Sequence, residues 1–404
     1  MSDVSLTRAA VAEPRGGRAG VVPVLALGTF AVGTDAFVVA GFLPELAADL
    51  GVSTSAAGQA VTVFAAAYAL LSPVLATLTA RVPRRTLLVT ALAGLGAANL
   101  ASALAPTFAA LLATRVAAAG AAAAFTPNAG AVAASLARPE RRAGALAVVV
   151  GGLTAATALG VPLGGLAGQW TGWRWALAAV AGLALAAAGA VALLLPALPG
   201  GPAVALRERL AVLRRPAVRA ILPLTALGMA AAYTVYAYSV PALAAVGLTA
   251  RDAAWALGLY GVGAVLGNLG AGLATDRLGG VGVLTAGYLV MAVALGGLGL
   301  LAASGTRAPV LVGLLALAWG ASSWCQTPPQ QHRLIAAAPQ EAPLVVALNS
   351  SAIYAGIGAG TLSGGLTVHS GAAALYATAT GLALLALLYL LLTAATLPRA
   401  DRHG

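Results

Sequence analysis

Long apolar stretches separated by short polar breaks cover most of this chain of 404 residues. An apolar run of about 20 residues can cross the ~30 Å hydrocarbon core of a bilayer as a helix. The polar breaks predict twelve such helices, with approximate bounds 21–43, 57–80, 86–105, 108–135, 143–168, 174–196, 219–246, 253–275, 281–303, 308–331, 342–368 and 371–397. We therefore expect an all-α integral membrane protein with twelve transmembrane helices.

The longest break, residues 197–218, is rich in Pro, Gly and Arg and falls at the middle of the chain. It predicts a linker between two six-helix bundles, 21–196 and 219–397, with tails at 1–20 and 398–404. The bundles share short sequences at corresponding places: PELAA at 44–48 and PALAA at 241–245, Thr126-Pro127 and Thr327-Pro328, and Gly160, Gly164, Gly165 and Gly360, Gly364, Gly365. Repeated halves with a site between them at mid-membrane are typical of transporters that work by alternating access.

Basic residues are unevenly placed along the chain. All 22 are Arg, and 18 of them fall in the segments that share a side if the first helix starts inside. The opposite segments hold Arg174, Arg251 and Arg307, and Arg115 lies within a span. Because cytoplasmic loops carry an excess of basic residues, we expect both tails and the linker to be cytoplasmic, in the cell (inner) membrane. This also accounts for the net charge of +11 without a nucleic-acid partner.

Composition excludes several classes of protein. Only 8% of residues are charged, against about 25% in soluble domains. Residues 1–20 lack an apolar core, so they are predicted to be a retained tail and not a signal peptide. The single cysteine, Cys325, excludes an intrachain disulfide, and the scattered histidines suggest no metal site. No HExxH, Ser/His/Asp cluster or phosphate-binding loop indicates an enzyme, and no soluble domain is large enough for a sensor.

Two ionisable residues lie deep in the predicted spans of the first bundle. Asp35, in the first span, costs roughly 2.5–3.5 kcal/mol as a charged group at that depth. It is tolerated if it faces water or a partner or is protonated, and such a group is suited to carrying protons. Arg115, in the fourth span, has a similar cost, and we hypothesise that the two pair directly or through water. The alternatives are that Asp35 only bonds a neighbouring helix and that Arg115 extends to the interface.

A cavity for a drug-like molecule should be mostly apolar with a few polar contacts. The candidates to line it are Phe64, Tyr68, Tyr233, Tyr236, Trp324, Gln326 and Asn349, together with Asp35. Each aromatic residue could instead pack between helices or lie at a membrane interface. An interhelical hydrogen bond would explain Asn349 equally well.

The loop after the eighth span carries the first recognisable family signature. Its sequence GLATDRLGG, from Gly272 to Gly280, is similar to the GxxxDRxGRR loop of the major facilitator superfamily. The loop after the second span keeps three arginines but has Ala80 at the acid position and Pro83 at a glycine. The resemblance implies a role in conformational change for Arg81, Arg84, Arg85, Gly272, Asp276, Arg277 and Gly279. For the first copy, the missing acid argues against a latch, and a merely basic loop is the alternative.

The fifth span contains Gly160, Pro162, Gly164 and Gly165. Small residues at this spacing allow close helix crossing, and the proline bends the helix. The segment resembles the GPxxGG antiporter signature of the same superfamily, with the proline displaced by one position. Small-residue packing alone is the alternative.

Residues 26–54, 81–88 and 151–175 resemble bacterial twelve-helix drug:proton antiporters of the chloramphenicol-resistance and arabinose-efflux type, in which an Arg like Arg115 is implicated in proton coupling. The resemblance implies the major facilitator fold of two pseudo-symmetric six-helix bundles. It also implies a multidrug-resistance function, the proton-coupled export of a small hydrophobic compound or drug. The alternative is a proton symporter that imports a sugar or other small nutrient. We expect a monomer in the lipid bilayer, with a small-molecule substrate, protons as the coupling ion and no other cofactor.

Overall fold

The computed structural model describes residues 20–138, 142–201, 207 and 211–396. Most of the two predicted tails and the middle of the predicted linker lie outside these residues. Twelve helices of the described chain are long and apolar enough to cross a membrane. Their bounds are Val21–Asp49, Thr54–Leu78, Arg84–Ala103, Phe108–Leu136, Gly144–Thr171, Trp173–Leu194, Pro216–Tyr236, Asp252–Thr275, Arg277–Ser304, Pro309–Ala337, Leu344–Ser370 and Ala372–Ala394. The predicted all-α, twelve-helix fold is confirmed.

Some of these spans are built from more than one helical element. The first half contains α1 (Val21–Val38), the 3₁₀ turn η1 (Val39–Phe42), α2 (Leu43–Asp49), α3 (Thr54–Leu78), α4 (Arg84–Ala103), α5 (Phe108–Leu136), α6 (Arg142–Ala155), the π-helical turn η3 (Ala156–Gly160), α7 (Val161–Thr171) and α8 (Trp173–Leu194). The second half contains the turn η4 (Val212–Arg214), α10 (Pro216–Tyr236), α11 (Ser239–Ala245), α12 (Ala250–Ser304), α13 (Pro309–Trp324), α14 (Thr327–Ala337), the turn η5 (Pro339–Glu341), α15 (Ala342–Thr367), the turn η6 (Val368–Ser370) and α16 (Ala372–Thr396).

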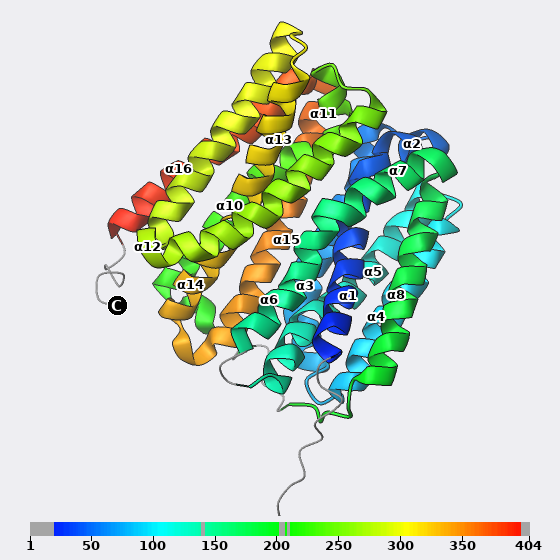
Figure 1. Ribbon diagram of the computed structural model, residues 1–404, viewed down its shortest axis with the longest axis vertical. Coiled ribbons are helices and arrows are strands. Elements are labelled where there is room, and N and C mark those ends of the chain that lie inside the picture. The colour runs from blue at the N-terminus through cyan, green and yellow to red at the C-terminus, as the bar shows by residue number, and fades with distance from the viewer. Residues whose placement is uncertain (1–19, 139–141, 202–206, 208–210, 397–404) are drawn as a thin grey trace, which may run out of the picture.

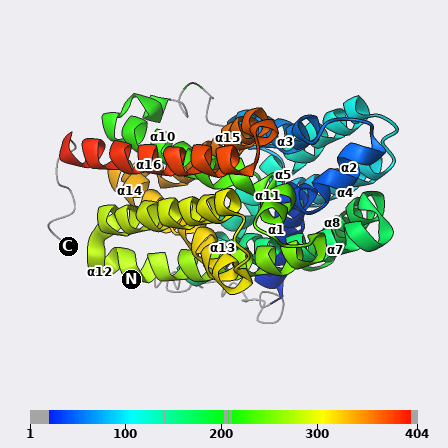
Figure 2. The same cartoon turned by 90° about the horizontal axis from the view of Figure 1, so that it is seen from above.

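The two halves stand side by side with their helices running in the same general direction (Figure 1). Seen from above, α4, α5 and α8 lie on one side and α12, α14 and α16 on the other (Figure 2). The halves meet where α3 packs on α15 and where α12 packs on η3 and α7. These contacts place a long interface between the halves along the direction of the spans.

The connections between spans fall alternately at two faces of the molecule. We call the end that carries the α3–α4 loop and residues 195–201 the linker face, because Arg84 N donates to Leu198 O (3.0 Å). The opposite end is the far face. Hydroxyl side chains cap three helix starts at the far face: Ser53 for α3, Thr107 for α5 and Thr249 for α12. Such caps satisfy backbone N–H groups that have no partner within the helix.

The repeated PELAA and PALAA sequences explain why two spans break at the same place. A proline ring clashes with the carbonyl four residues earlier and interrupts the helix. Pro44 follows the 3₁₀ turn η1, and Pro241 follows the break between α10 and α11. The predicted seventh span, 219–246, therefore consists of two helices, of which α10 ends at Tyr236. Pro162 acts similarly in the fifth span, where it follows the π-helical turn η3.

Candidate functional site

Asp35 of α1 and Arg115 of α5 form a direct ion pair. Arg115 Nη1 lies 2.6 Å from Asp35 Oδ1, and Nη2 donates to the Asp35 backbone oxygen at 3.1 Å. Both side chains are buried, with exposed fractions of 0% for Asp35 and 1% for Arg115. Within the described chain, Asp35 Oδ2 and Arg115 Nε lack hydrogen-bond partners. The pair is neutral as a unit, so a proton taken up by Asp35 would leave a net positive charge at this position.

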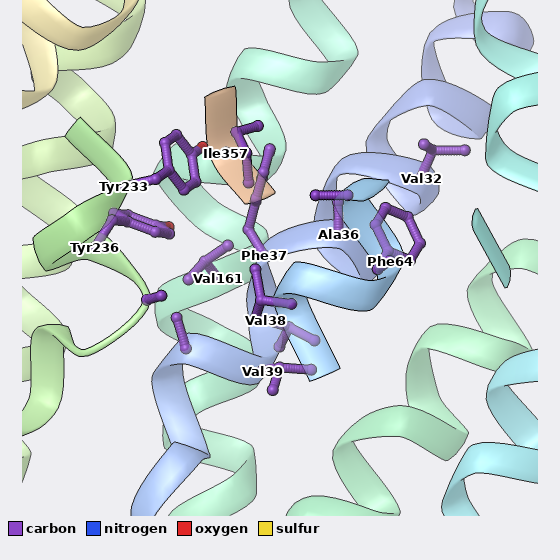
Figure 3. Packing of buried hydrophobic residues seen from close by; sticks show 14 of the residues in the cluster. Val32, Ala36, Phe37, Val38, Val39, Phe64, Val161, Tyr233, Tyr236 and Ile357 are labelled. Atoms are coloured by element: carbon purple, nitrogen blue, oxygen red, sulfur yellow. The ribbon is translucent and has the colours of Figure 1, made fainter. Parts of the chain in front are cut away.

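Six aromatic side chains, which we call the aromatic cluster, gather between the two halves. They are Phe37 of α1, Tyr233 and Tyr236 of α10, Tyr260 of α12, and Trp319 and Trp324 of α13. Phe37 comes from the first half and lies 5.5 Å from the Tyr233 ring and 6.2 Å from those of Tyr236 and Trp324. Figure 3 shows both tyrosines reaching from α10 toward Phe37. Phe37 lies two residues from Asp35 in α1, a spacing at which two side chains do not share a face of a helix.

A second aromatic contact joins the halves between α3 and α15. The rings of Tyr68 and Tyr354 stack with centroids 3.7 Å apart, and Phe64 lies 6.2 Å from Tyr354. The guanidinium carbon of Arg115 lies 4.6 Å from the centroid of the Phe64 ring. Cation–π attraction of this kind stabilises a buried guanidinium. Phe64 therefore connects the ion pair to the interface between α3 and α15.

The structure thus brings seven of the predicted residues together around one interface: Asp35, Phe64, Tyr68, Arg115, Tyr233, Tyr236 and Trp324. Gln326 and Asn349 are placed differently. Asn349 Oδ1 accepts a hydrogen bond from Thr225 at 3.0 Å, and Gln326 Oε1 accepts one from Tyr288 at 3.1 Å. Both bonds lie within the second half, where they join neighbouring helices.

A known family model matches most of the chain. Residues 25–342 match the family model MFS_1, described as "Major Facilitator Superfamily". The chain belongs to the major facilitator superfamily. The match begins within α1 and ends just after η5.

Relatives in the superfamily extend over nearly the same length. The chain is 31% identical over 348 residues to "Inner membrane transport protein YdhP" of Escherichia coli K12, covering 86% of this chain and 88% of that protein. It is 29% identical over 348 residues, with the same coverage, to "Uncharacterized MFS-type transporter YbcL" of Bacillus subtilis 168. The chain is therefore a multi-pass membrane protein of a transporter family, and these names leave its substrate open.

Solved structures of the superfamily have the same fold at low sequence identity. A D-xylose-proton symporter aligns with a TM-score of 0.73 at 16% identity, over 92% of this chain and 96% of that one. The human organic anion transporter MFSD10 aligns with a TM-score of 0.69 at 18% identity, over 94% of this chain and 100% of that one. These likenesses support the fold and say nothing of direction or substrate.

The glycine-rich segment 160–165 packs directly on α1 and η1. A methyl group added at Gly160 would collide with the Thr34 side chain, and one at Gly164 would collide with Val38. Gly165 lies against Gly41, backbone to backbone. In the second half, methyl groups at Gly356, Gly360 and Gly364 of α15 would likewise collide with the backbone of α10. Each half therefore contains at least one pair of helices packed more closely than a side chain at these glycines would permit.

The two loop signatures of the superfamily have different surroundings. In the first loop, Arg84 Nη1 donates to Asn128 Oδ1 of α5 at 2.9 Å, and Arg85 donates to the backbone oxygen of Ala192. The carbonyl of Ala80, at the position of the missing acid, accepts from Gly201 N at 2.8 Å. The first loop is thus hydrogen-bonded to helices of its own half and to the residues that follow α8.

In the second loop, the backbone breaks at Gly279, whose φ of 71° is left-handed. Such a φ favours glycine because any other residue would place its Cβ against the backbone. Gly272 has open space around it, and Arg277 is exposed. The side chain of Asp276 lies outside the described residues. The roles predicted for the two loops stay predictions.

Four aromatic residues at the interface were not among the sequence candidates: Phe37, Tyr260, Trp319 and Tyr354. Tyr260, Trp319 and Tyr354 each lie ten or more residues after the first residue of their helices, α12, α13 and α15. Belt aromatics lie near the ends of spans, so a ring at mid-span is the signal that could have identified them.

Proposed function

We propose that the protein is a proton-coupled secondary transporter that exports a small hydrophobic compound or drug by alternating access. The observation that carries this proposal is the buried Asp35–Arg115 pair, which Phe64 connects to the interface between the halves. An ionisable pair inside a membrane protein is costly and commonly marks an ion or proton pathway. Here Arg115 lies over the ring of Phe64, which contacts Tyr354 of the second half.

Charge accounting at the pair supports proton exchange. In the paired state the two charges compensate each other, and a substrate can approach a neutral site. When Asp35 takes a proton, Arg115 becomes an uncompensated buried cation, which favours a different arrangement of its surroundings. Proton and substrate would therefore compete. A potential of 100 mV is worth about 2.3 kcal/mol per charge moved, which is adequate to drive export.

Contacts between the halves support closure at the far face. Ser55 Oγ donates to Gly365 O at 2.7 Å, and Tyr238 OH donates to Ser55 O at 3.5 Å. Gly261 of α12 lies against the backbone of Thr157 and Ala158 in η3. The distribution of arginines favours a cytoplasmic linker face and cytoplasmic tails in the inner membrane. In that orientation this state would exchange its substrate with the cytoplasm. We propose a monomer in the lipid bilayer, with protons as the coupling ion and no nucleic-acid partner.

Import of a sugar is the alternative, and the D-xylose-proton symporter shares the fold. Recognition of a polyol needs polar groups that face the substrate and fix its orientation. The oxygens of the two predicted cavity amides, Gln326 and Asn349, accept hydrogen bonds within the second half. The aromatic character of the interface supports a hydrophobic compound instead.

Drug accumulation in a pump-deficient bacterium tests this proposal. Wild type should lower accumulation of at least one compound in a panel that includes chloramphenicol, and a protonophore should abolish the effect. Asp35→Asn should match the empty vector at equal expression. Asp49→Asn, which removes an exposed carboxylate paired with Arg174 at the far face, is the control and should export normally.

Equal export by Asp35→Asn and wild type would show that Asp35 is structural. Uptake of a labelled sugar into energised cells, without export of any compound in the panel, would favour the importer.

A further inference from the structure

Five hydrogen-bond donors in the aromatic cluster have no hydrogen-bond partner in the described chain. Two of them, the Tyr260 hydroxyl and the Trp324 indole Nε1, interact with each other. The other three are the hydroxyls of Tyr233 and Tyr236 and the indole Nε1 of Trp319. All three side chains are buried, each with an exposed fraction of at most 1%. Buried polar groups are nearly always hydrogen-bonded, because an unmade bond in a dry interior costs free energy. Such donors indicate a place where a ligand or water supplies acceptors.

The chemistry of these donors restricts what can bind them. An indole N–H can only donate, so Trp319 requires an acceptor atom. A tyrosine hydroxyl also satisfies its donor with an acceptor such as a carbonyl, ether or nitro oxygen. All three lie on the second half, on α10 and α13, while Phe37 faces them from α1. When the halves separate, Phe37 would leave Tyr233, Tyr236 and Trp324, and the flat ring of a bound compound could take its place.

The charges near the cluster restrict the ligand further. Among the described residues, the buried charged side chains are Asp35, Arg115 and Arg333. The one carboxylate is already paired with Arg115 at 2.6 Å. A cationic ligand would therefore find no free carboxylate as a counter-charge there, and burial of an unpaired charge is strongly unfavourable. Aromatic faces attract cations, but the aromatic cluster contains no carboxylate that would compensate the charge of a buried cationic ligand.

We propose that the aromatic cluster binds an uncharged, flat compound through hydrogen-bond acceptor oxygens, and that Tyr233, Tyr236 and Trp319 are the donors that select it. This inference rests on the proposed function, since it names the substrate class of the same site. The two halves then have separate tasks. The first half holds the proton-binding pair, and the second half supplies the uncharged donors that recognise the compound. Exchange of a neutral compound for protons moves net charge.

A matched set of fluorescent acridines tests the charge and the acceptor together. The probes are 10-methylacridone (neutral, with a carbonyl acceptor), 10-methylacridinium (the same ring system as a cation, without the carbonyl) and 10-carboxymethylacridone (an anion). Binding to the purified full-length protein in detergent is measured by quenching of tryptophan fluorescence. The neutral probe should bind at least about tenfold more tightly than the cation and the anion.

Variants test whether the three donors make the contact. Tyr233→Phe, Tyr236→Phe and Trp319→Phe should each weaken binding of the neutral probe about 2- to 12-fold, the effect of one hydrogen bond to an uncharged acceptor. The matched control is Tyr376→Phe, because the Tyr376 hydroxyl already donates to Ala242 O at 3.2 Å elsewhere in the second half. It should leave binding unchanged.

Thermal unfolding without probe separates recognition from structure. Removal of an unpartnered hydroxyl at Tyr233 or Tyr236 should not lower the melting temperature, whereas Tyr376→Phe should lower it. Equal or tighter binding of the cation or the anion, no binding of any probe, or unchanged binding in all three donor variants would each overturn the proposal. Proton-coupled export of a cation in the accumulation assay would sink this inference and leave the proposed function intact.

Discussion

The buried ion pair leads to a prediction about stability that does not depend on knowing the substrate. The changes are Asp35→Asn, Arg115→Gln and the two together. At a separation of 2.6 Å and an effective dielectric constant of about 20, the two charges attract by about 6 kcal/mol. Burial of both charges costs several kcal/mol each, so the net contribution of the pair to stability is small. A single variant loses the attraction and keeps the cost of burying the remaining charge.

Asp35→Asn should therefore lower the free energy of unfolding by about 3–5 kcal/mol. Arg115→Gln should cost less, because a stranded carboxyl can take up a proton whereas a guanidinium stays charged. The double variant buries no charge and should lie within about 1 kcal/mol of wild type, although it should not couple transport to protons. Reversible unfolding in mixed detergent micelles measures all four proteins as a double-mutant cycle.

The exposed pair between Asp49 and Arg174 is the control for this cycle. Its side chains are 46% and 39% exposed, and exposed pairs contribute less than about 1 kcal/mol. Asp49→Asn should be nearly neutral. If the losses of Asp35→Asn and Arg115→Gln simply add in the double variant, the two residues are not energetically coupled and the reasoning is refuted.

Two further predictions concern the contacts between and within the halves. Gly261→Ala places a methyl group against the backbone of η3 and should disfavour the far-face closure by about 1–3 kcal/mol, a roughly 5- to 150-fold shift. Opening of the far face should expose residue 59. In a Cys325→Ser background, an impermeant maleimide should therefore label Gln59→Cys more extensively. Gly258→Ala, with open space around it, should not change labelling, and an equal effect of both variants would contradict the contact. Thr225→Val removes the hydroxyl that bonds Asn349 and Gln330 and should lower the free energy of unfolding by about 1–3 kcal/mol. Thr171→Val, exposed and bonded within its own helix, should change it by less than about 0.5 kcal/mol, and an equal loss in both would argue against the network.

Sequence alone could identify the spans because the bilayer imposes length and polarity on every helix. It could also single out Asp35 and Arg115, since a charge at that depth has a cost that composition reveals. Which aromatic rings meet was harder to predict. Trp319 and Tyr260 touch each other only because α12 and α13 present particular faces to one another, and that choice depends on packing across distant segments. The polarity of Asn349 predicts a cavity residue, but its side-chain oxygen accepts a hydrogen bond from Thr225 on the neighbouring helix.

Residues 195–201 are hydrogen-bonded to the first half, which shortens the segment that connects the two halves. Gly201 is held by Ala80, and on the other side Val212 is buried against Val218 and Leu334 of the second half. Ten residues separate these anchors, although the polar break in the sequence is twice as long. A chain of that length spans at most about 40 Å, and it joins the halves at the linker face alone. Insertions after Gly201 should therefore be tolerated, whereas a deletion that consumed most of those ten residues would restrain separation at the linker face and leave the far face free to part.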